Sequence, residues 1–281
     1  MDIDAYLNRI GYHGPRDPTA RTLRELHTAH MLTVPFENLS IHLGQPIIID
    51  EDALFHKIVE RRRGGFCYEL NGLFAALLRA LGFDVTLLSA GVAHQGGGFG
   101  PEFDHMALLV YAPGDRGLGT GDWGLGSGSQ SPIANPQSPI PAPGGWLADV
   151  GFGDSFRQPL RLDEPGAQQQ DGRAYQLARE GERWTLLAHE DGTNWSPQYQ
   201  FSLQPRRLDD YVAMCHYHQT SPASSFTQRR LCSLATPQGR ITLSDMRLIF
   251  TSDGVKQERL LADQQEYAAA LREHFGINLD A

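Results

Sequence analysis

The sequence is poor in cysteine and has no long hydrophobic run. Only three of its 281 residues are cysteines, Cys67, Cys215 and Cys232, and no two of them form a CxxC pair. An odd and small number of cysteines argues against a secreted disulfide framework and favours a reducing compartment. No apolar stretch approaches the roughly 18 residues of a membrane-spanning helix, and no signal peptide is apparent. We therefore expect a soluble, cytoplasmic protein without a membrane partner.

Positive charge is also scarce. There are 24 Lys+Arg against 33 Asp+Glu, which gives a formal net charge of −9 and a pI near 5.6. This balance disfavours a general electrostatic attraction to nucleic acid or anionic lipid, so we expect no nucleic-acid partner. The sequence contains no internal repeat and no Walker-type phosphate loop. Its hydrophobic and charged fractions, 41% and 20%, are those of a globular protein, and its length corresponds to about two domains.

Glycine and proline, in contrast, are abundant, with 30 and 17 residues. The stretch 112–145 alone contains nine glycines, six prolines and four serines. A segment of this composition cannot bury enough apolar surface to pack. We interpret it as a long surface insertion.

The first part of the chain, 1–82, is predicted to be helical. Thr19 or Thr22 can cap a helix that runs through His30, and Asp50 can cap one that runs to about Arg62. The clearest helix follows Phe66, because its apolar residues recur at the helical period and Gly82 is placed to end it. These apolar residues are Leu70, Leu73, Phe74, Leu77, Leu78 and Leu81.

From Phe83 the pattern changes to short strands, which indicates an antiparallel sheet or a small barrel. Strands are predicted at 83–93, 105–111, 146–150, 173–180, 183–190 and 198–204. The last part is mixed, with a helix at 208–216, strands at 229–235, 240–243 and 246–251, and a helix at 263–275 that ends at Gly276. The expected domains are therefore 1–82 (helical), 83–204 (β-barrel, with the insertion at 112–145) and 205–281 (α/β).

Cys67 is a candidate nucleophile because it lies in the first turn of the clearest helix, after Arg62-Arg63-Gly64-Gly65-Phe66. A helix N-terminus and nearby arginines favour the thiolate, which is the reactive form of cysteine. The two glycines are expected to permit a tight approach and to leave room for a substrate. The alternative is a buried cysteine that acts only as a small hydrophobic residue.

A nucleophilic cysteine needs a base, and the base needs a residue that orients it. His105 opens the strand 105–111, which would hold its imidazole rigidly, although it can equally be an ordinary strand-end histidine. Asp149 lies between apolar neighbours on a short strand, where a carboxylate needs a partner; its alternative role is to cap a turn. Two other acids are less suitable, because Asp104 should alternate to the opposite strand face and Asp154 should cap a turn. Asp122 falls within the insertion.

These motifs together resemble the arylamine N-acetyltransferase family. The resemblance rests on Val34-Pro35-Phe36-Glu37-Asn38-Leu39, on Arg63-Gly64-Gly65-Phe66-Cys67-Tyr68-Glu69-Leu70-Asn71, on His105, and on Asp149-Val150-Gly151-Phe152-Gly153. It implies an α+β fold with an N-terminal helical bundle, a central antiparallel β-barrel, a C-terminal α/β lid and a core like that of cysteine proteases and transglutaminases.

The resemblance also implies a Cys67, His105, Asp149 triad that takes the acetyl group from acetyl-CoA. The acetyl group then passes to an arylamine, arylhydroxylamine or hydrazine in a ping-pong reaction typical of xenobiotic metabolism. The acceptor pocket that it implies is lined by Phe36, Val92, Phe152 and Phe201. The corresponding CoA contacts are Gly151, Gly153, Thr220, Ser221 and Ser224. No metal is expected, and a homo-oligomer stays open.

Two features depart from the family pattern. The insertion separates His105 from Asp149 by 44 residues, far more than the family usually has there. Cys215-His216-Tyr217-His218 stands where an Asn and small polar residues are more common, and it can alter the approach of CoA. A metal site there would need a second ligand cluster.

The triad alone does not choose the acyl acceptor. A thiol hydrolase or a transglutaminase-like acyl transferase therefore stays an alternative, and so does a binding module with an inert triad.

Overall fold

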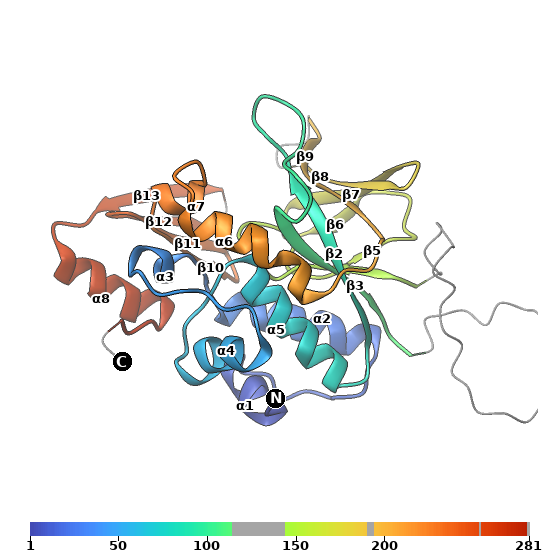
Figure 1. Ribbon diagram of the computed structural model, residues 1–281, viewed down its shortest axis with the longest axis horizontal. Coiled ribbons are helices and arrows are strands. Elements are labelled where there is room, and N and C mark those ends of the chain that lie inside the picture. The colour runs from blue at the N-terminus through green and yellow to red at the C-terminus, as the bar shows by residue number, and fades with distance from the viewer. Residues whose placement is uncertain (114–143, 190–193, 253, 280–281) are drawn as a thin grey trace, which may run out of the picture.

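The computed structural model describes residues 1–113, 144–189, 194–252 and 254–279. The fold is α+β, with N-terminal helices packed against two antiparallel sheets (Figure 1). Residues 114–143, the greater part of the predicted insertion, lie outside the described residues, and so does Asp122.

The N-terminal helices surround α5, the helix that carries Cys67. Their bounds are α1 Ile3–Arg9, α2 Ala20–Thr33, α3 Leu39–His42, α4 Glu51–Phe55, a π-helical turn His56–Glu60, and α5 Cys67–Ala80. Thr19 caps α2 and Asp50 caps α4, as the sequence predicts. The helix predicted to reach Arg62 ends two residues earlier, at the π-helical turn, and Arg62 itself has a positive φ of 50°. Gly82, with φ of 93°, follows α5 as expected.

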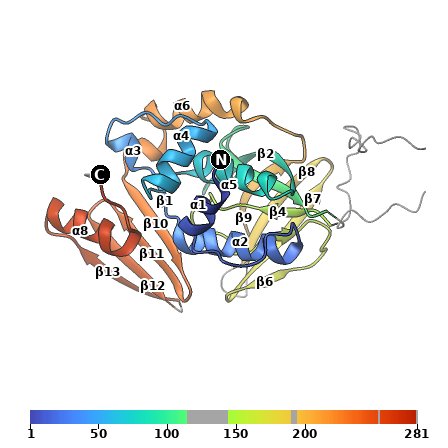
Figure 2. The ribbon, with the colours of Figure 1, turned by 90° about the horizontal axis from the view of Figure 1, so that it is seen from below.

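Eight strands form a nearly closed barrel in the order β5-β4-β3-β2-β9-β8-β7-β6. Their bounds are β2 Asp84–Val92, β3 His105–Tyr111, β4 Trp146–Ala148, β5 Leu160–Arg161, β6 Gln168–Gln170, β7 Arg173–Glu180, β8 Arg183–His189 and β9 Ser196–Ser202. The two edge strands are joined through one side chain, because the Gln168 amide donates to Arg161 O and accepts from Arg161 N. Helix α5 packs on β2 and β3, which places its first turn at the end of the barrel (Figure 2).

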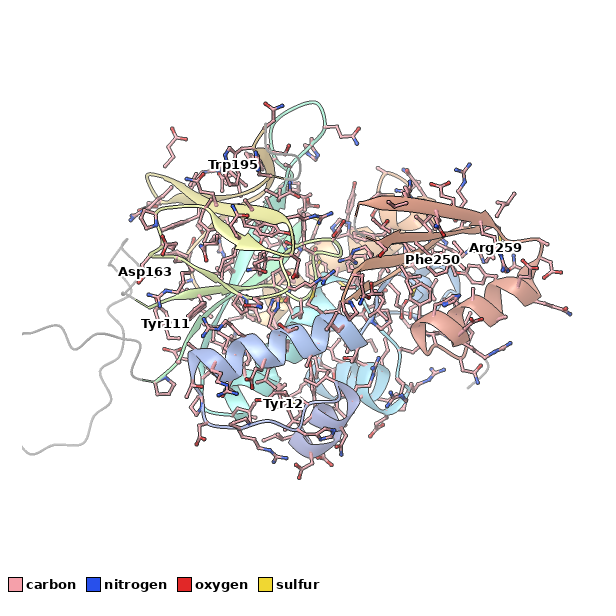
Figure 3. All side chains as sticks on the ribbon, turned by 180° about the vertical axis from the view of Figure 1, so that it is seen from behind. Tyr12, Tyr111, Asp163, Trp195, Phe250 and Arg259 are labelled. Atoms are coloured by element: carbon pink, nitrogen blue, oxygen red, sulfur yellow. The ribbon has the colours of Figure 1, made fainter. Side chains whose placement is uncertain are left out.

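The C-terminal sheet has the order β1-β10-β11-β12-β13 and is covered by α8. Its strands are β1 Phe36–Glu37, β10 Leu231–Thr236, β11 Gly239–Ser244, β12 Arg247–Ser252 and β13 Val255–Leu260; α8 spans Gln264–Phe275. Phe250 lies between this sheet and α8 (Figure 3), where its ring meets His274 edge to face at 5.3 Å. A 3₁₀ turn Leu208–Tyr211, α6 Val212–Thr220 and α7 Ser225–Gln228 connect the barrel to this sheet.

The structure corrects the predicted elements at four strands. β1 lies inside the segment predicted to be helical, and it pairs with β10, so Phe36 opposes Ser233. β5, β6 and β13 have no counterpart in the prediction. Two residues of β5 are too few to show a period, Gln168–Gln170 is entirely polar, and every residue of β13 is exposed. None of these segments alternates between apolar and polar residues, which is the signal of a half-buried strand.

Buried side chains form three clusters. One surrounds α5 and the face of β2 and β3 on which α5 packs, a second fills the barrel, and a third lies between the C-terminal sheet and α8. Within the described part of the chain, no helix combines the length and the apolar character that a membrane crossing requires.

Candidate active site

Cys67 is the first residue of α5, and its side chain is almost fully buried. Burial is the main influence on the thiol and raises its pKa well above the ordinary value. A hydrogen bond with the Met106 main chain works in the opposite direction, whereas the nearby charge of Asp149 raises the pKa further. The helix N-terminus alone is therefore insufficient to keep this thiol ionised.

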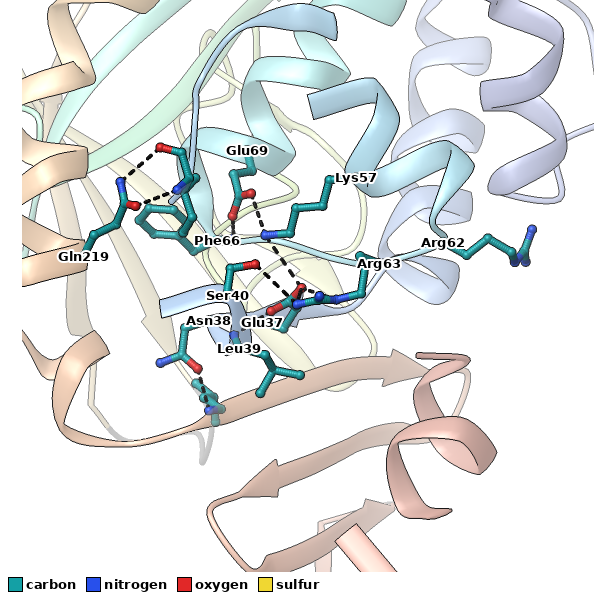
Figure 4. Close-up of polar contacts among 12 residues, drawn as sticks. Glu37, Asn38, Leu39, Ser40, Lys57, Arg62, Arg63, Phe66, Glu69 and Gln219 are labelled. Atoms are coloured by element: carbon teal, nitrogen blue, oxygen red, sulfur yellow. Dashed lines mark hydrogen bonds and ion pairs between the residues drawn. The ribbon is translucent and has the colours of Figure 1, made fainter. Parts of the chain in front are cut away.

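The expectation that Arg62 and Arg63 favour the thiolate is wrong. Arg63 is buried and donates from Nη2 and Nε to Glu37 Oε1, at 2.8 and 3.1 Å. Arg62 is exposed and points away from this cluster (Figure 4). Lys57 completes the network by donating to Glu69 at 2.6 Å, and Glu69 in turn accepts from the main-chain N–H of Phe66. These charges neutralise one another beneath the turn that leads into α5.

The two glycines before Phe66 permit a tight approach, as predicted, but they do not provide the predicted room for a substrate. A Cβ atom at Gly64 would lie 1.9 Å from the carbonyl oxygen of Pro35, and one at Gly65 would lie 2.7 Å from Glu69 Cβ. Gly65 also forms a bridge to Phe36 and accepts a hydrogen bond from Glu37 N. The glycines thus let the main chain before Cys67 pack against β1, and the room they provide is taken by protein atoms.

His105 and Asp149 form a buried hydrogen-bonded pair. His105 Nε2 lies 2.7 Å from Asp149 Oδ2, and both side chains are nearly inaccessible to solvent. Burial alone would raise the pKa of Asp149, but His105 and hydrogen bonds from Asn71 and Gly151 outweigh it, so that pKa is lowered. With Nε2 engaged by the carboxylate, Nδ1 is the ring atom left for another partner.

Asn71 was quoted in the sequence motif without a role, and the structure gives it one. Its Nδ2 donates to Met106 O at 2.6 Å and to Asp149 Oδ1 at 2.8 Å, while its Oδ1 accepts from Val150 N. Asn71 lies one helical turn after Cys67, on the same face of α5. It therefore ties the helix of the nucleophile to β3 and to the segment that carries Asp149.

His27 was not predicted as a site residue, but it accepts a hydrogen bond from the main chain of Asp149. Its Nδ1 lies 2.8 Å from the Arg157 carbonyl, which can only accept, and its Nε2 accepts the main-chain N–H of Asp149 at 3.1 Å. Both bonds together require a neutral imidazole with its proton on Nδ1. Burial is the main cause that lowers the pKa of His27, to about 4.

One cavity of about 860 Å³ is lined by Cys67 and His105. Three of the four predicted acceptor-pocket residues also line it, namely Phe36, Val92 and Phe152. Phe152 packs against His105 with ring centroids 5.1 Å apart. Phe201 does not line this cavity. It lies in the barrel core, where it stacks on Trp184, because its side chain points inward from β9.

The predicted CoA contacts divide into two groups. Gly151 and Ser224 line the cavity, and Gly153 lies beside it, where a Cβ atom would be 3.8 Å from the Phe36 ring. Thr220 and Ser221 do not belong to the lining residues. The Thr220 hydroxyl donates to His216 O, and the Ser221 hydroxyl accepts from Ala223 N. Both hydroxyls thus shape the connection between α6 and α7.

Several lining residues were not predicted. Asp104 faces the cavity and does not point to the opposite side, because it precedes β3 in a turn where its carboxylate accepts from Val92 N. It pairs with His218 Nε2 at 3.4 Å. The other unpredicted members include Met214, Tyr217 and Phe226. The unusual stretch Cys215–His218 was the one signal that could have indicated them.

Metal ligation finds no support in the geometry. In the described ranges, no group of three or more His, Cys, Asp or Glu side chains is arranged to hold a metal ion. Asp154, expected to cap a turn, instead accepts hydrogen bonds from Arg173 and pairs with Arg240.

Comparison with known protein sequences finds N-acetyltransferases. Residues 19–143 and 141–281 match a family model described as N-acetyltransferase. The chain is 33% identical to the arylamine N-acetyltransferase of Mycolicibacterium smegmatis, over 99% of this chain and 93% of that protein. It is 31% identical to the Salmonella typhimurium protein named arylamine N-acetyltransferase / N-hydroxyarylamine O-acetyltransferase, over 99% and 89% of the two chains.

Solved structures agree with these relatives. A variant of the Mycobacterium smegmatis enzyme superposes with a TM-score of 0.84 at 32% identity, and the match covers 100% of this chain and 94% of that one. The Mycobacterium marinum arylamine N-acetyltransferase, solved in complex with CoA, superposes with a TM-score of 0.83 at 31% identity, over 99% and 94% of the chains.

Proposed function

This chain belongs to the arylamine N-acetyltransferase family, and from that premise we propose that it moves an acetyl group to an arylamine, arylhydroxylamine or hydrazine through an acetyl-cysteine at Cys67. It is an acyltransferase with acetyl-CoA as its co-substrate. The proposal rests above all on one observation: Cys67 and His105 share the wall of one cavity, and the buried carboxylate of Asp149 holds His105 through Nε2.

The burial of Cys67 decides how the nucleophile is activated. Since burial raises the pKa of the thiol, the thiolate forms only when a neighbouring group takes the proton and carries a compensating positive charge. His105 Nδ1 takes that proton, and the carboxylate of Asp149 stabilises the imidazolium through Nε2. The nucleophile is therefore a Cys67 thiolate paired with the His105 imidazolium, and the buried carboxylate of Asp149 stabilises the imidazolium.

In the first half-reaction the Cys67 sulfur attacks the thioester carbonyl of acetyl-CoA. The carbonyl oxygen carries negative charge in the tetrahedral intermediate, and the main-chain N–H of Cys67 at the start of α5 is the donor we assign to it. Collapse of the intermediate breaks the bond to the CoA sulfur, which leaves as the thiol after it receives the proton from His105. The products are acetyl-Cys67 and free CoA.

In the second half-reaction the amine nitrogen attacks the acetyl-cysteine. His105 accepts the amine proton as the new C–N bond forms and returns it to the Cys67 sulfur as the C–S bond breaks. The walls formed by Phe36, Val92 and Phe152 are apolar and flat, which suits an aromatic amine. Gly151, Gly153 and Ser224 are the neighbouring positions that we assign to CoA.

We assign three domains, 1–82, 83–204 and 205–281, and a cytoplasmic location. The cluster that fills the barrel lies within 83–204, and the cluster under α8 lies within 205–281 except for Leu39, whereas the cluster around α5 joins residues of all three domains. All three cysteines are free, which fits a reducing compartment.

The decisive experiment is an intact-mass measurement after the protein is mixed with acetyl-CoA in the absence of an amine. We expect an acetyl-sized adduct that is lost in Cys67→Ala and retained in Cys232→Ala, a matched change of another buried free cysteine. Addition of an arylamine should then remove the adduct and yield the acetylated amine. Release of acetate at the same rate with and without the amine would favour a thiol hydrolase, and transfer to a protein lysine would favour a transglutaminase-like enzyme.

A further inference from the structure

A second cavity, of about 630 Å³, lies on the other side of the segment that follows Asp149. It is bounded by residues 154–157, by the β6–β7 turn and by the β10–β11 turn. These turns belong to the barrel and to the C-terminal sheet, whose lower ends adjoin in Figure 2. We call it the arginine cavity, after the lining residues Arg157, Arg173 and Arg240.

The arginine cavity has more positive than negative charge. Asp154 and Asp171 are the acidic residues of its lining, against three guanidinium groups. Asp154 serves two of them, because Arg173 donates to it at 2.8 and 3.2 Å and Arg240 Nε lies 3.1 Å from it. Burial is the main factor that lowers the pKa of Arg240, and the charges of Arg173 and Arg157 lower it further. The positive charges of these arginines are thus held close together, and a bound anion would reduce the repulsion between them.

A hydroxyl group in the same wall has no partner. Ser155 is 7% exposed, and its Oγ makes no hydrogen bond among the residues that the structure describes. A buried polar atom without a partner costs free energy and calls for an explanation. Beside guanidinium groups, a hydroxyl hydrogen can be donated to the oxygen of a bound anion.

The cavity of Cys67 has the opposite character. None of the described residues that line it is a lysine or an arginine, and it contains the carboxylate of Asp104. Acetyl-CoA, however, carries a diphosphate and a 3′-phosphate, which are held in proteins by charge-assisted hydrogen bonds. The negatively charged half of the co-substrate therefore needs a second place on the protein.

The two cavities are adjacent. Gly151 and Phe152 line the first, Asp154 and Ser155 line the second, and the intervening Gly153 has a positive φ of 87° and no side chain over the Phe36 ring. The three residue steps from Gly151 to Asp154 span at most about 10 Å. The slender pantetheine arm of acetyl-CoA can pass over Gly153 from one cavity to the other.

The C-terminal sheet connects the two cavities by a second route. Phe36 of the first cavity pairs in register with Ser233, and the Ser233 hydroxyl accepts a hydrogen bond from Arg240 of the second at 3.0 Å. Adjacent strands are roughly 4.8 Å apart. The Cys67 cavity and the arginine cavity are thus separated by about one strand of the sheet.

We propose that the arginine cavity binds phosphate groups, with Arg173, Arg240 and Ser155 as donors, and that acetyl-CoA supplies them. This rests on the proposed function, because it assumes that the thioester end lies at Cys67. Free inorganic phosphate has the same chemistry, so the test separates the two sources. Arg157 is left out of the donor set because it donates to the carbonyls of Pro237 and Gly239 and pairs with Asp171, whereas Arg173 and Arg240 share the single carboxylate of Asp154.

The test compares acetyl-CoA with S-acetyl-N-acetylcysteamine, an acetyl thioester without phosphate. In Arg173→Gln and in Arg240→Gln, the KM for acetyl-CoA should rise about tenfold or more, as loss of one charge-assisted hydrogen bond implies, with kcat little changed. The kcat/KM for the phosphate-free donor should stay at the wild-type value. Arg240→Lys, which retains the charge, should restore part of the affinity.

Arg183→Gln is the matched control, because Arg183 lies on the barrel strand β8, is exposed and does not line the cavity. An unchanged KM for acetyl-CoA in a folded Arg173→Gln or Arg240→Gln would overturn the proposal. Calorimetric titration with inorganic phosphate that is abolished by Arg240→Gln, combined with an unchanged KM, would assign the cavity to free phosphate and overturn the assignment to acetyl-CoA. If neither thioester acetylates Cys67, the proposed function fails instead.

Discussion

The main-chain N–H of Asp149 donates a hydrogen bond to Nε2 of His27, a neutral and fully buried imidazole. His27 belongs to α2, which is remote in sequence from Asp149 and the other residues of the proposed reaction. The bond nevertheless fixes the main chain of the residue that orients His105. A charged His27 would have a proton on Nε2 facing the N–H of Asp149, so this support exists only while His27 is neutral.

The neutral state of His27 predicts a loss of stability in acid. Its pKa is about 4 in the folded protein against 6.5 for an unperturbed histidine. Between these two pH values the unfolded chain binds a proton at His27 and the folded chain does not. The full contribution is present above pH 6.5 and is lost progressively as the pH falls to about 4, by about 3 kcal/mol. Urea unfolding at several pH values should show a smaller loss in His27→Gln, with the exposed His13→Gln like wild type. An equal loss in all three proteins would contradict this.

Asp149→Asn is expected to abolish most activity and to preserve the fold. The asparagine amide would donate to His105 Nε2, which places the ring proton on Nδ1, where it cannot accept the proton of Cys67. A comparable change in another triad costs about 10⁴-fold in kcat, and we expect a loss of about 10³-fold or more. The rate of Cys67 acetylation by rapid-quench mass spectrometry, with circular dichroism for the fold, measures it. Near-normal turnover would remove Asp149 from the triad.

Gly151→Ala should destabilise the protein although alanine is small. A Cβ atom there would lie 2.7 Å from Cys67 Cα and 2.8 Å from Asn71 Nδ2, so the nucleophile or the asparagine must move. Overpacking of this kind costs roughly 1–3 kcal/mol. Thermal unfolding should show a lower Tm than wild type. The control is Gly96→Ala, because no atom lies within 4 Å of its added Cβ; equal Tm values would refute the expectation.

Arg62 and Arg63 should differ sharply on substitution, although they are neighbours. Arg63→Gln leaves Glu37 buried without its main partner, and removal of one member of a buried pair costs about 3–5 kcal/mol. Arg62→Gln changes an exposed side chain and should alter the free energy of unfolding by less than about 0.5 kcal/mol. Chemical denaturation of both variants measures the difference. A similar loss in the two proteins would argue against the buried network.

Replacement of residues 114–143 by a short turn should preserve acetylation of Cys67. β3 and β4 pair in antiparallel register with Val110 opposite Trp146, so Tyr111 and Gly145 already lie where a hairpin turn can join them. The change should therefore leave His105 and Asp149 in place. Intact-mass analysis of the shortened protein with acetyl-CoA tests this, and loss of the adduct in a folded variant would show that the segment participates.

The sequence predicts best those features whose signal is local. The helix of Cys67 combines a regular apolar stripe with Gly82 at its end, and its predicted position agrees with α5. Thr19, Asp50 and Gly276 likewise end or begin helices as expected, because capping depends on a few neighbouring residues.

Features that depend on distant partners could not be predicted in this way. Nothing near Arg63 in the sequence indicates that Glu37 would neutralise it, and Phe201 follows the strand pattern whichever face it occupies. His27 and Asn71 act through main-chain groups of other elements, and such bonds leave no residue pattern. Gly64 and Gly151 suggest only flexibility in the sequence, whereas in the structure each is required by the close approach of another segment.

The pairing of Phe36 with Ser233 has a consequence for the order of folding. The turn before Cys67 packs against β1 through the bridge between Gly65 and Phe36. β1 in turn completes its hydrogen bonds only with β10, near the end of the chain. Contacts between residues so far apart in sequence form slowly. During synthesis, the nucleophile therefore emerges from the ribosome long before the strand that frames it, and an N-terminal fragment ending before residue 231 would carry the thiol without a complete catalytic setting.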